Sequence, residues 1–214
     1  MKERPILFSA PMVKAILDGR KTVTRRVVKP QPPANAHQVE TWHHPDTKPR
    51  FFTWTTAGEI SDQWEPLPCP YGQPGEKLWV RETWMDLLGT GIERKTGDHG
   101  RYAYAADTPP GSYGDDQRKA YGLKWRPSIH MPRAASRITL EVTDVRVERL
   151  QDISETDALE EGITYNDLPN NGLDPRRART WYHRLWESIN GPGSWDANPF
   201  VWVVEFKRVE GGAA

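Results

Sequence analysis

The segment that most restricts the fold lies near the end of the chain, where residues 200–206 read FVWVVEF. All but one of these side chains are apolar, and they are of the β-branched and aromatic types that favour strands. Because successive side chains of a strand point to opposite faces, this segment needs apolar cover on both sides. The pattern predicts a strand at the centre of a sheet or in the wall of a barrel.

Other segments predict the strands that pair with it. Residues 136–150 place apolar side chains at every second position, and a break at Thr143 and Asp144 predicts a β-bulge. Residues 75–84 alternate in the same way after a turn. Shorter strands are predicted at residues 5–8, 22–26, 50–55 and 101–105.

Three helices are predicted between the strands. The first runs from Ser9 to Gly19, and the second lies at residues 153–162, with Ser154 as N-cap, Asp157 in the capping-box position and Gly162 as C-cap. The third covers residues 175–189. Its expected inward face consists of Ala178, Trp181, Leu185, Trp186 and Ile189. Since no βαβ unit repeats, we predict an α+β fold: a small mixed β-barrel with flanking helices.

The chain of 214 residues and 24.5 kDa is long enough for one substantial domain. We predict a single domain over residues 1–209, with insertions at about 28–74 and 86–135, and a disordered tail at 210–214. The first insertion is rich in proline, which disfavours helices, but the strand predicted at residues 50–55 indicates that it is ordered.

Charge is balanced in total but not along the chain. Lys plus Arg equals Asp plus Glu at 29 each, so net charge gives no argument for binding a polyanion. Basic residues nevertheless gather in segments 10–30 and 117–140, and acidic residues in segment 150–161. Separate basic and acidic segments are more typical of a site than of a uniformly mixed surface.

The first candidate site is the helix-to-strand segment at residues 16–26. One interpretation is a solvated edge strand, where Lys and Arg discourage pairing with other sheets. The other is an anion or nucleotide site, within which a Thr hydroxyl becomes nucleophilic if burial lowers the pKa of Lys21. The cationic and hydroxyl side chains are Arg20, Lys21, Arg25, Arg26, Thr22 and Thr24.

The second candidate site is the stretch at residues 124–133, where two prolines bracket a single turn. Cations alternate there with an aromatic plane and an imidazole, a combination that suits base stacking and phosphate pairing. The alternative is a buried Trp and a loop His that bonds to the backbone. The residues concerned are Lys124, Trp125, Arg126, His130 and Arg133.

No motif indicates a cofactor. The single Cys69 cannot form an intramolecular disulfide or a thiol metal cluster, and we interpret His43 and His44 as part of a solvated loop, so no metal is expected. The sequence has no apolar segment of membrane-spanning length and no apolar signal core. We therefore expect a cytoplasmic protein without a membrane partner.

The order of these motifs resembles the ASCH domain family, part of the PUA-like superfamily of small β-barrels that handle RNA or modified nucleobases. The resemblance rests on residues 16–25, 75–80, 158–162 and 203–206, and the insertions resemble those of a longer phage- or prophage-associated branch. It implies a modified nucleoside or an RNA as partner. We expect binding of a nucleobase, nucleoside or RNA segment in a basic cleft.

A further expectation from this resemblance is hydrolysis of N4-acetylcytidine, which a short bacterial ASCH branch performs with a Lys, a Thr and a Glu. The matching positions are Lys21, Thr24 and Glu161, with the adjacent Glu160 as an alternative for the acid. The resemblance implies that Thr24 is the nucleophile, Lys21 its general base, and Glu161 the group that orients Lys21 or moves the proton.

Three alternatives remain open. An RNA-binding module without catalysis would depend on Arg26 and Trp125 but not on Thr24. A ribonuclease would use His130 or Lys21 in acid–base roles and Arg133 to hold phosphate. A phage structural or interaction protein would need an exposed apolar patch.

Overall fold

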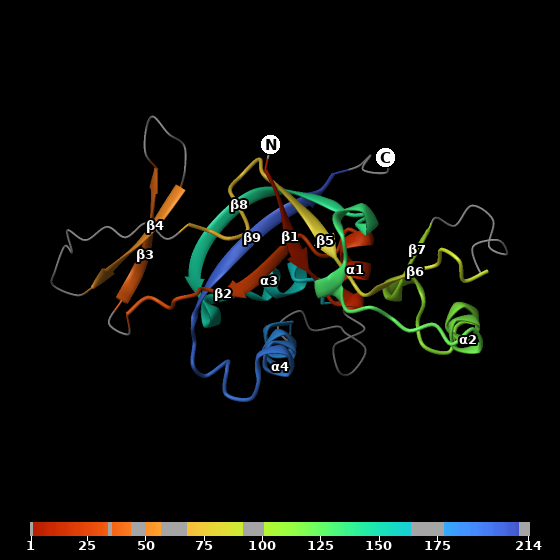
Figure 1. The fold of residues 1–214 in the computed structure, drawn as a ribbon. Coiled ribbons are helices and arrows are strands. Elements are labelled where there is room, and N and C mark those ends of the chain that lie inside the picture. The colour runs from red at the N-terminus through yellow and green to blue at the C-terminus, as the bar shows by residue number, and fades with distance from the viewer. Residues whose placement is uncertain are drawn as a thin grey trace.

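The computed structural model describes residues 2–33, 36–43, 50–56, 68–91, 101–163 and 178–209. Its centre is a five-stranded mixed sheet with the order β1-β5-β8-β9-β2 (Figure 1). Strand β1 runs parallel to β5, and the other neighbours are antiparallel. The strands are β1 (Glu3–Leu7), β2 (Val23–Val27), β5 (Lys77–Arg81), β8 (Thr139–Arg149) and β9 (Phe200–Arg208).

Strand β9 lies between β8 and β2, which confirms the prediction of a central strand. Its alternate side chains enter two different cores, as two-sided burial requires. Trp202 and Val204 pack in the cluster that includes β1, β5 and α1 (Ala10–Leu17), whereas Val201 and Val203 pack against α3 (Glu155–Glu160) and α4 (Ala178–Asn190). The predicted bulge in β8 is also present, between Val142 and Asp144.

The mixed α+β class is confirmed. Among the described residues β1 and β2 form the two edges of the sheet, and its closure into a barrel stays a prediction.

The prediction of three helices was wrong, because a fourth, α2 (Tyr113–Ala120), lies in the second insertion. Asp115 and Asp116 in its first turn and Arg118 and Lys119 in its last turn suit the helix dipole. Since α2 has no apolar stripe, hydrophobic spacing could not reveal it.

Helix α3 ends beside the first candidate site. Ser154 and Asp157 form the predicted capping box at its N-terminus. Glu161 occupies the C-cap position, and Gly162, one residue beyond, has a φ of 95°, a conformation that favours glycine. The prediction therefore placed the C-cap one residue too late, at Gly162. The end of α3 directs the Glu161 side chain toward the start of β2.

The inward face of α4 differs from the prediction. Its buried residues are Ala178, Tyr182 and Trp186, whereas Ile189, expected inside, is 56% exposed. Two neighbouring apolar rows run along this helix, and the row at four-residue spacing from Ala178 enters the core. The other row, which includes Trp181 and Leu185, is half-buried and lines a cavity described below.

The two insertions contain the predicted short strands. Figure 1 shows the hairpin of β3 (Ala36–His43) and β4 (Arg50–Thr56) to one side of the main sheet, and β6 (Trp84–Asp86), β7 (Tyr102–Tyr104) and α2 to the other. No helix in the described part of the chain is long and apolar enough to cross a membrane. The interpretation of His43 as a loop residue was wrong, because His43 is the last residue of β3. His44 and the predicted tail lie outside the described residues, and the division into one domain stays a prediction.

Candidate functional site

The first candidate site forms where the start of β2 meets the end of α3. Lys21 and Glu161 form an isolated backbone bridge, and Thr22 N–H donates to the Glu160 carbonyl at 3.0 Å. The Ala15 carbonyl, near the end of α1, accepts hydrogen bonds from the N–H groups of Arg20 and Lys21. The end of α1 and the end of α3 therefore both fix the backbone around Lys21, although α3 is distant from it in sequence.

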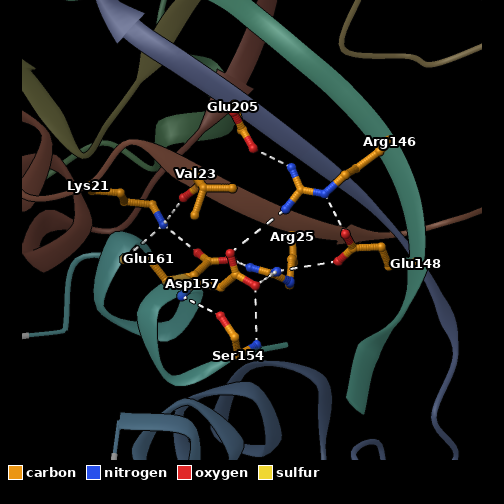
Figure 2. Close-up of polar contacts among 9 residues, drawn as sticks. All are labelled: Lys21, Val23, Arg25, Arg146, Glu148, Ser154, Asp157, Glu161 and Glu205. Atoms are coloured by element: carbon orange, nitrogen blue, oxygen red, sulfur yellow. Dashed lines mark hydrogen bonds and ion pairs between the residues drawn. The ribbon is translucent and has the colours of Figure 1, made fainter. Parts of the chain in front are cut away.

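The Lys21 side chain is fully buried and makes three hydrogen bonds. Its Nζ donates to Glu161 Oε2 at 2.5 Å, to the Glu161 carbonyl at 2.8 Å and to the Val23 carbonyl at 2.8 Å (Figure 2). An ammonium has three protons, so each has an acceptor. Burial lowers the pKa of Lys21, and the negative charge of Glu161 opposes this effect.

Arg25 is a buried cation surrounded by carboxylates. Its guanidinium nitrogens lie 3.2 Å from Asp157, 3.5 Å from Glu148 and 3.6 Å from Glu161, and its side chain is fully buried. Arg146, on the same side of the sheet, forms ion pairs with Glu148 and Glu205 (Figure 2). These two arginines and Lys21 are the cations that pair with the carboxylates of this cluster, which are Glu148, Asp157, Glu161 and Glu205.

Glu161 has one carboxylate oxygen that is not hydrogen-bonded. Oε2 accepts from Lys21, whereas Oε1 is buried and has no hydrogen-bond partner among the described residues, its nearest cation being Arg25 Nη1 at 3.6 Å. Burial and the adjacent Glu161 charge raise the pKa of Tyr182 well above its ordinary value. A side-chain hydrogen bond with Glu161 contributes to this rise, so the Tyr182 hydroxyl lies close to the Glu161 carboxylate.

A small chamber of about 60 Å³ lies beside this carboxylate, between α1, β2 and α4. Thr24 lines the chamber, and within the described ranges its hydroxyl has no hydrogen-bond partner. Arg26 also lines it, and its guanidinium donates to the Leu7 carbonyl at 2.6 Å. The polar part of the lining consists of Thr24, Arg25, Arg26, Glu161, Tyr182 and Asn190.

A large chamber of about 370 Å³ adjoins the small one between α1 and α4. Met12, Glu161 and Leu185 line both chambers, so these residues stand at their junction. The rest of the large chamber is mostly apolar. It is lined by Pro11, Ala15, Ile163 and Trp181, with Ser9, Arg184 and Ser188 as polar members.

The structure brings together the three residues that the resemblance implied as catalytic. Lys21 bonds to Glu161, and Thr24 lines the same chamber as Glu161. Of the two glutamates left open by the sequence, Glu160 is exposed and contributes its backbone carbonyl, whereas Glu161 contacts Lys21. Arg20 lies outside the chambers and donates to the Gly162 carbonyl at 2.8 Å.

The second candidate site is separate from the first. Its predicted turn is present as a short 3₁₀ helix, Ser128–His130. Arg126 lies 5.2 Å above the Trp84 ring, and Arg118 lies 5.5 Å above the Trp125 ring. Arg133 pairs with Glu3 at 2.8 Å, while Lys124 and His130 are exposed. Across the described part of the chain, none of the contacts of this stretch reaches Lys21, Thr24 or Glu161.

Two residues of the site were not predicted from the sequence. Tyr182 is a neighbour of Glu161, and Arg146 belongs to the same network of ion pairs. The spacing of Tyr182 four residues from both Ala178 and Trp186 was a usable signal for its burial. Nothing in the sequence around Arg146 indicated its ion pairs, because they depend on strand register. No group of three or more potential metal ligands occurs within the described ranges.

Comparison with known proteins gives no relative. The chain matches no protein-family model, no curated protein and no solved structure.

Proposed function

We propose that this chain is an ASCH-type hydrolase with a PUA-like barrel, acting on the amide of an N4-acylated cytidine. The observation that carries the proposal is that Thr24 and Glu161 line one chamber while Lys21 holds the second oxygen of Glu161. This arrangement combines a hydroxyl nucleophile with a carboxylate whose position is fixed by a buried cation.

The proposed reaction proceeds through an acylated threonine. The Thr24 oxygen attacks the amide carbonyl carbon, and its proton passes to Glu161. The carbon–nitrogen bond then breaks as Glu161 returns the proton to N4, which releases cytidine. Water, deprotonated by Glu161, then attacks the carbonyl carbon of the Thr24 ester. As the ester bond breaks, Glu161 returns this proton to the Thr24 oxygen, which restores the hydroxyl and the carboxylate and releases the carboxylic acid. Donors at Arg25 or Arg26 stabilise the negative charge that develops on the carbonyl oxygen.

This proposal exchanges the roles that the resemblance implied for Lys21 and Glu161. Glu161 lines both chambers, whereas the Lys21 side chain is fully buried and its protons are all donated. Lys21 is therefore proposed as a positioning residue that orients Glu161. Glu161, which lines both chambers, is proposed to move the proton.

The test is hydrolysis of N4-acetylcytidine followed by absorbance, with thermal unfolding as a check of folding. Thr24→Val and Glu161→Gln preserve shape and should each lower kcat by about a hundredfold or more. Thr22→Val is the matched control, because Thr22 is exposed and two residues away, and it should retain activity. Absence of turnover by the wild type, or full activity of folded Thr24→Val, would contradict the proposal.

The binding-only function is the second candidate, and a specific observation favours it. All three protons of Lys21 are satisfied, which is typical of a structural ion pair. In that case cytidine binds to wild type and Thr24→Val with equal affinity, Arg26→Ala weakens binding, and no variant or wild type shows turnover. Titration of cytidine by calorimetry distinguishes this result from hydrolysis.

A further inference from the structure

Strand β2 has a free edge, because among the described residues it pairs only with β9. In an antiparallel pair, the main-chain N–H and C=O groups of alternate residues point to the partner strand, and those of the residues between them point away. The N–H of Phe206 donates to the carbonyl of Thr22 at 2.8 Å, so the even-numbered residues of β2 face β9. The main-chain groups of Val23, Arg25 and Val27 therefore form the free edge.

Part of this free edge is occupied by the protein itself. The Val23 carbonyl accepts a hydrogen bond from Lys21 Nζ, and Lys21 forms the backbone bridge to Glu161 at the end of α3. Beyond that point, the N–H and C=O groups of Arg25 and Val27 have no hydrogen-bond partner in the described part of the chain. Buried main-chain groups are almost always paired, with protein, water or a ligand. The free edge therefore offers a donor and an acceptor at each of these two residues.

The small chamber lies along this free edge. The side chains of Thr24 and Arg26 point to one face of the sheet and those of Arg25 and Val27 to the other, yet all four residues line the chamber. A single chamber touches residues of both faces only at the border of a sheet. Helices α1 and α4 cover opposite faces, and both contribute to the chamber wall.

The accessible part of Arg25 is its main chain. The whole residue is 4% exposed, whereas its side chain is 0% exposed, because the guanidinium is enclosed among carboxylates. The exposed area therefore belongs to the main-chain part of Arg25. Since Arg25 lines the small chamber, these main-chain atoms are the part of the residue that a ligand there can reach.

The size of the chamber limits what can pair with the free edge. A water molecule needs about 10–15 Å³ on such a measure, so a volume of about 60 Å³ holds a few heavy atoms. A peptide that adds a strand to the sheet is much larger. The N–H and C=O groups of one edge residue point the same way, and a hydrogen-bonded partner uses both together. A small neutral molecule with an acceptor beside a donor, such as a carboxamide, matches this pair.

We propose that the free edge of β2 is a main-chain binding site for a small carboxamide. The Arg25 N–H donates to the carbonyl oxygen of the ligand, and the Arg25 carbonyl accepts from its nitrogen. The ligand then lies beside Thr24, the preceding residue. In the hydrolysis proposed above, the same N–H stabilises the oxygen that becomes negative when Thr24 attacks. This catalytic role rests on the proposed function, whereas binding at the edge does not.

The first experiment titrates the isotope-labelled full chain with acetamide and follows the main-chain amide signals by NMR. The Arg25 N–H signal should shift saturably, whereas that of the exposed Arg208, outside the chamber, should not. Acetone has the shape of acetamide with a methyl group in place of the amine. It should bind about fivefold more weakly, because the Arg25 carbonyl then stays unpaired. No saturable shift at Arg25, or equal affinity for the two compounds, would overturn the site.

The second experiment repeats the acetamide titration with Thr24→Ile and Thr24→Val. The main-chain groups of Thr24 face β9, so its side chain is the part that lines the chamber. Isoleucine adds bulk there and should weaken acetamide binding about tenfold, whereas valine keeps the shape of threonine and should bind acetamide as wild type does. Equal affinity in the two folded variants would place acetamide outside the chamber and overturn the proposal. If Thr24→Ile does not fold, the comparison of acetamide with acetone in wild type decides.

These titrations separate the edge site from the proposed hydrolase. A saturable Arg25 shift without turnover of N4-acetylcytidine would support the edge site and refute the hydrolase. Turnover without the shift would refute the edge site and leave the hydrolase standing.

Discussion

Lys21 and Glu161, 140 residues apart in sequence, form a 2.5 Å hydrogen bond in the protein interior. Their side chains are 0% and 3% exposed, so neither charge is balanced by solvent. A buried ion pair of this kind is costly to break, because the remaining partner keeps its desolvated charge. The same contact therefore stabilises the fold and fixes the geometry of the candidate site.

Replacement of Lys21 by Met should lower the free energy of unfolding by about 3–5 kcal/mol, because Glu161 would lose its ion-pair partner. The double variant Lys21→Met with Glu161→Leu should recover part of this loss, since it removes both charges. Urea denaturation measures the effect, with the exposed Lys14→Met in α1 as control. A double variant no more stable than the single one would argue against a coupled pair.

Replacement of Arg25 by Met should destabilise the protein by a similar amount, about 3–5 kcal/mol, because carboxylates from Glu148, Asp157 and Glu161 surround that guanidinium. Arg25→Lys keeps the charge but not the planar group, and an intermediate stability is expected. Chemical denaturation at neutral pH provides the values, and Arg208→Met on β9 provides an exposed comparison. Wild-type stability in Arg25→Met would show that the acidic cluster needs no internal cation.

The pH dependence of stability should include a contribution from Asp157. Burial alone would raise its pKa, but hydrogen bonds from Ser154 and the charge of Arg25 outweigh burial and lower the pKa below the ordinary 3.8. The unfolded chain then binds a proton at a pH where the folded chain does not. This stabilisation is complete above pH 3.8 and is lost as the pH falls through the folded pKa.

Asp157→Asn should accordingly flatten the fall of stability below about pH 4 while keeping an acceptor for the capping box. Thermal unfolding from pH 2.5 to 6 measures the slope, and Asp116→Asn, exposed in α2, is the control. A slope identical to that of wild type would mean that Asp157 contributes nothing to acid unfolding.

Gly162 should tolerate a side chain poorly. A Cβ there would lie 2.8 Å from the Cβ of Ala15 and 3.0 Å from that of Lys21, neither of which can rotate away. Gly19 also has a positive φ but has no atom within 4 Å of such a Cβ, so Gly19→Ala isolates the conformational cost. Gly162→Ala should be less stable than Gly19→Ala by about 1–3 kcal/mol in urea denaturation. Equal stability of the two variants would contradict the close packing of α1 against the site.

The parts of the fold that could be predicted from sequence are those fixed by local patterns. The two-sided apolar run around Trp202 indicated a central strand, and Ser154 with Asp157 indicated the start of α3. The candidate site was predicted from the Lys21 and Thr24 motif through its resemblance to a family. Only the structure shows that Glu161, and not Glu160, contacts Lys21, because adjacent side chains on a helix point in different directions.

The remaining features depend on three-dimensional packing. Trp181 and Leu185 are as apolar as core residues, and composition cannot distinguish the lining of a cavity from the interior of a core. Arg25 was predicted to bind substrate, whereas its contacts in the structure are internal ion pairs, although it also lines the small chamber. Its carboxylate partners lie on α3 and β8, so sequence spacing around Arg25 gave no indication of them.

The position of β9 between β8 and β2 also has a consequence for synthesis of the protein. Strand β2, which carries Thr24, is synthesised before residues 28–199, and its pairing partner β9 is synthesised after them. At about 5–20 residues per second, this interval is roughly ten to thirty-five seconds. During this interval the sheet beside the side chains of Lys21 and Arg25 is incomplete. A nascent chain that stops before residue 200 would therefore contain Lys21, Thr24 and Glu161 but not the strand that pairs with β2.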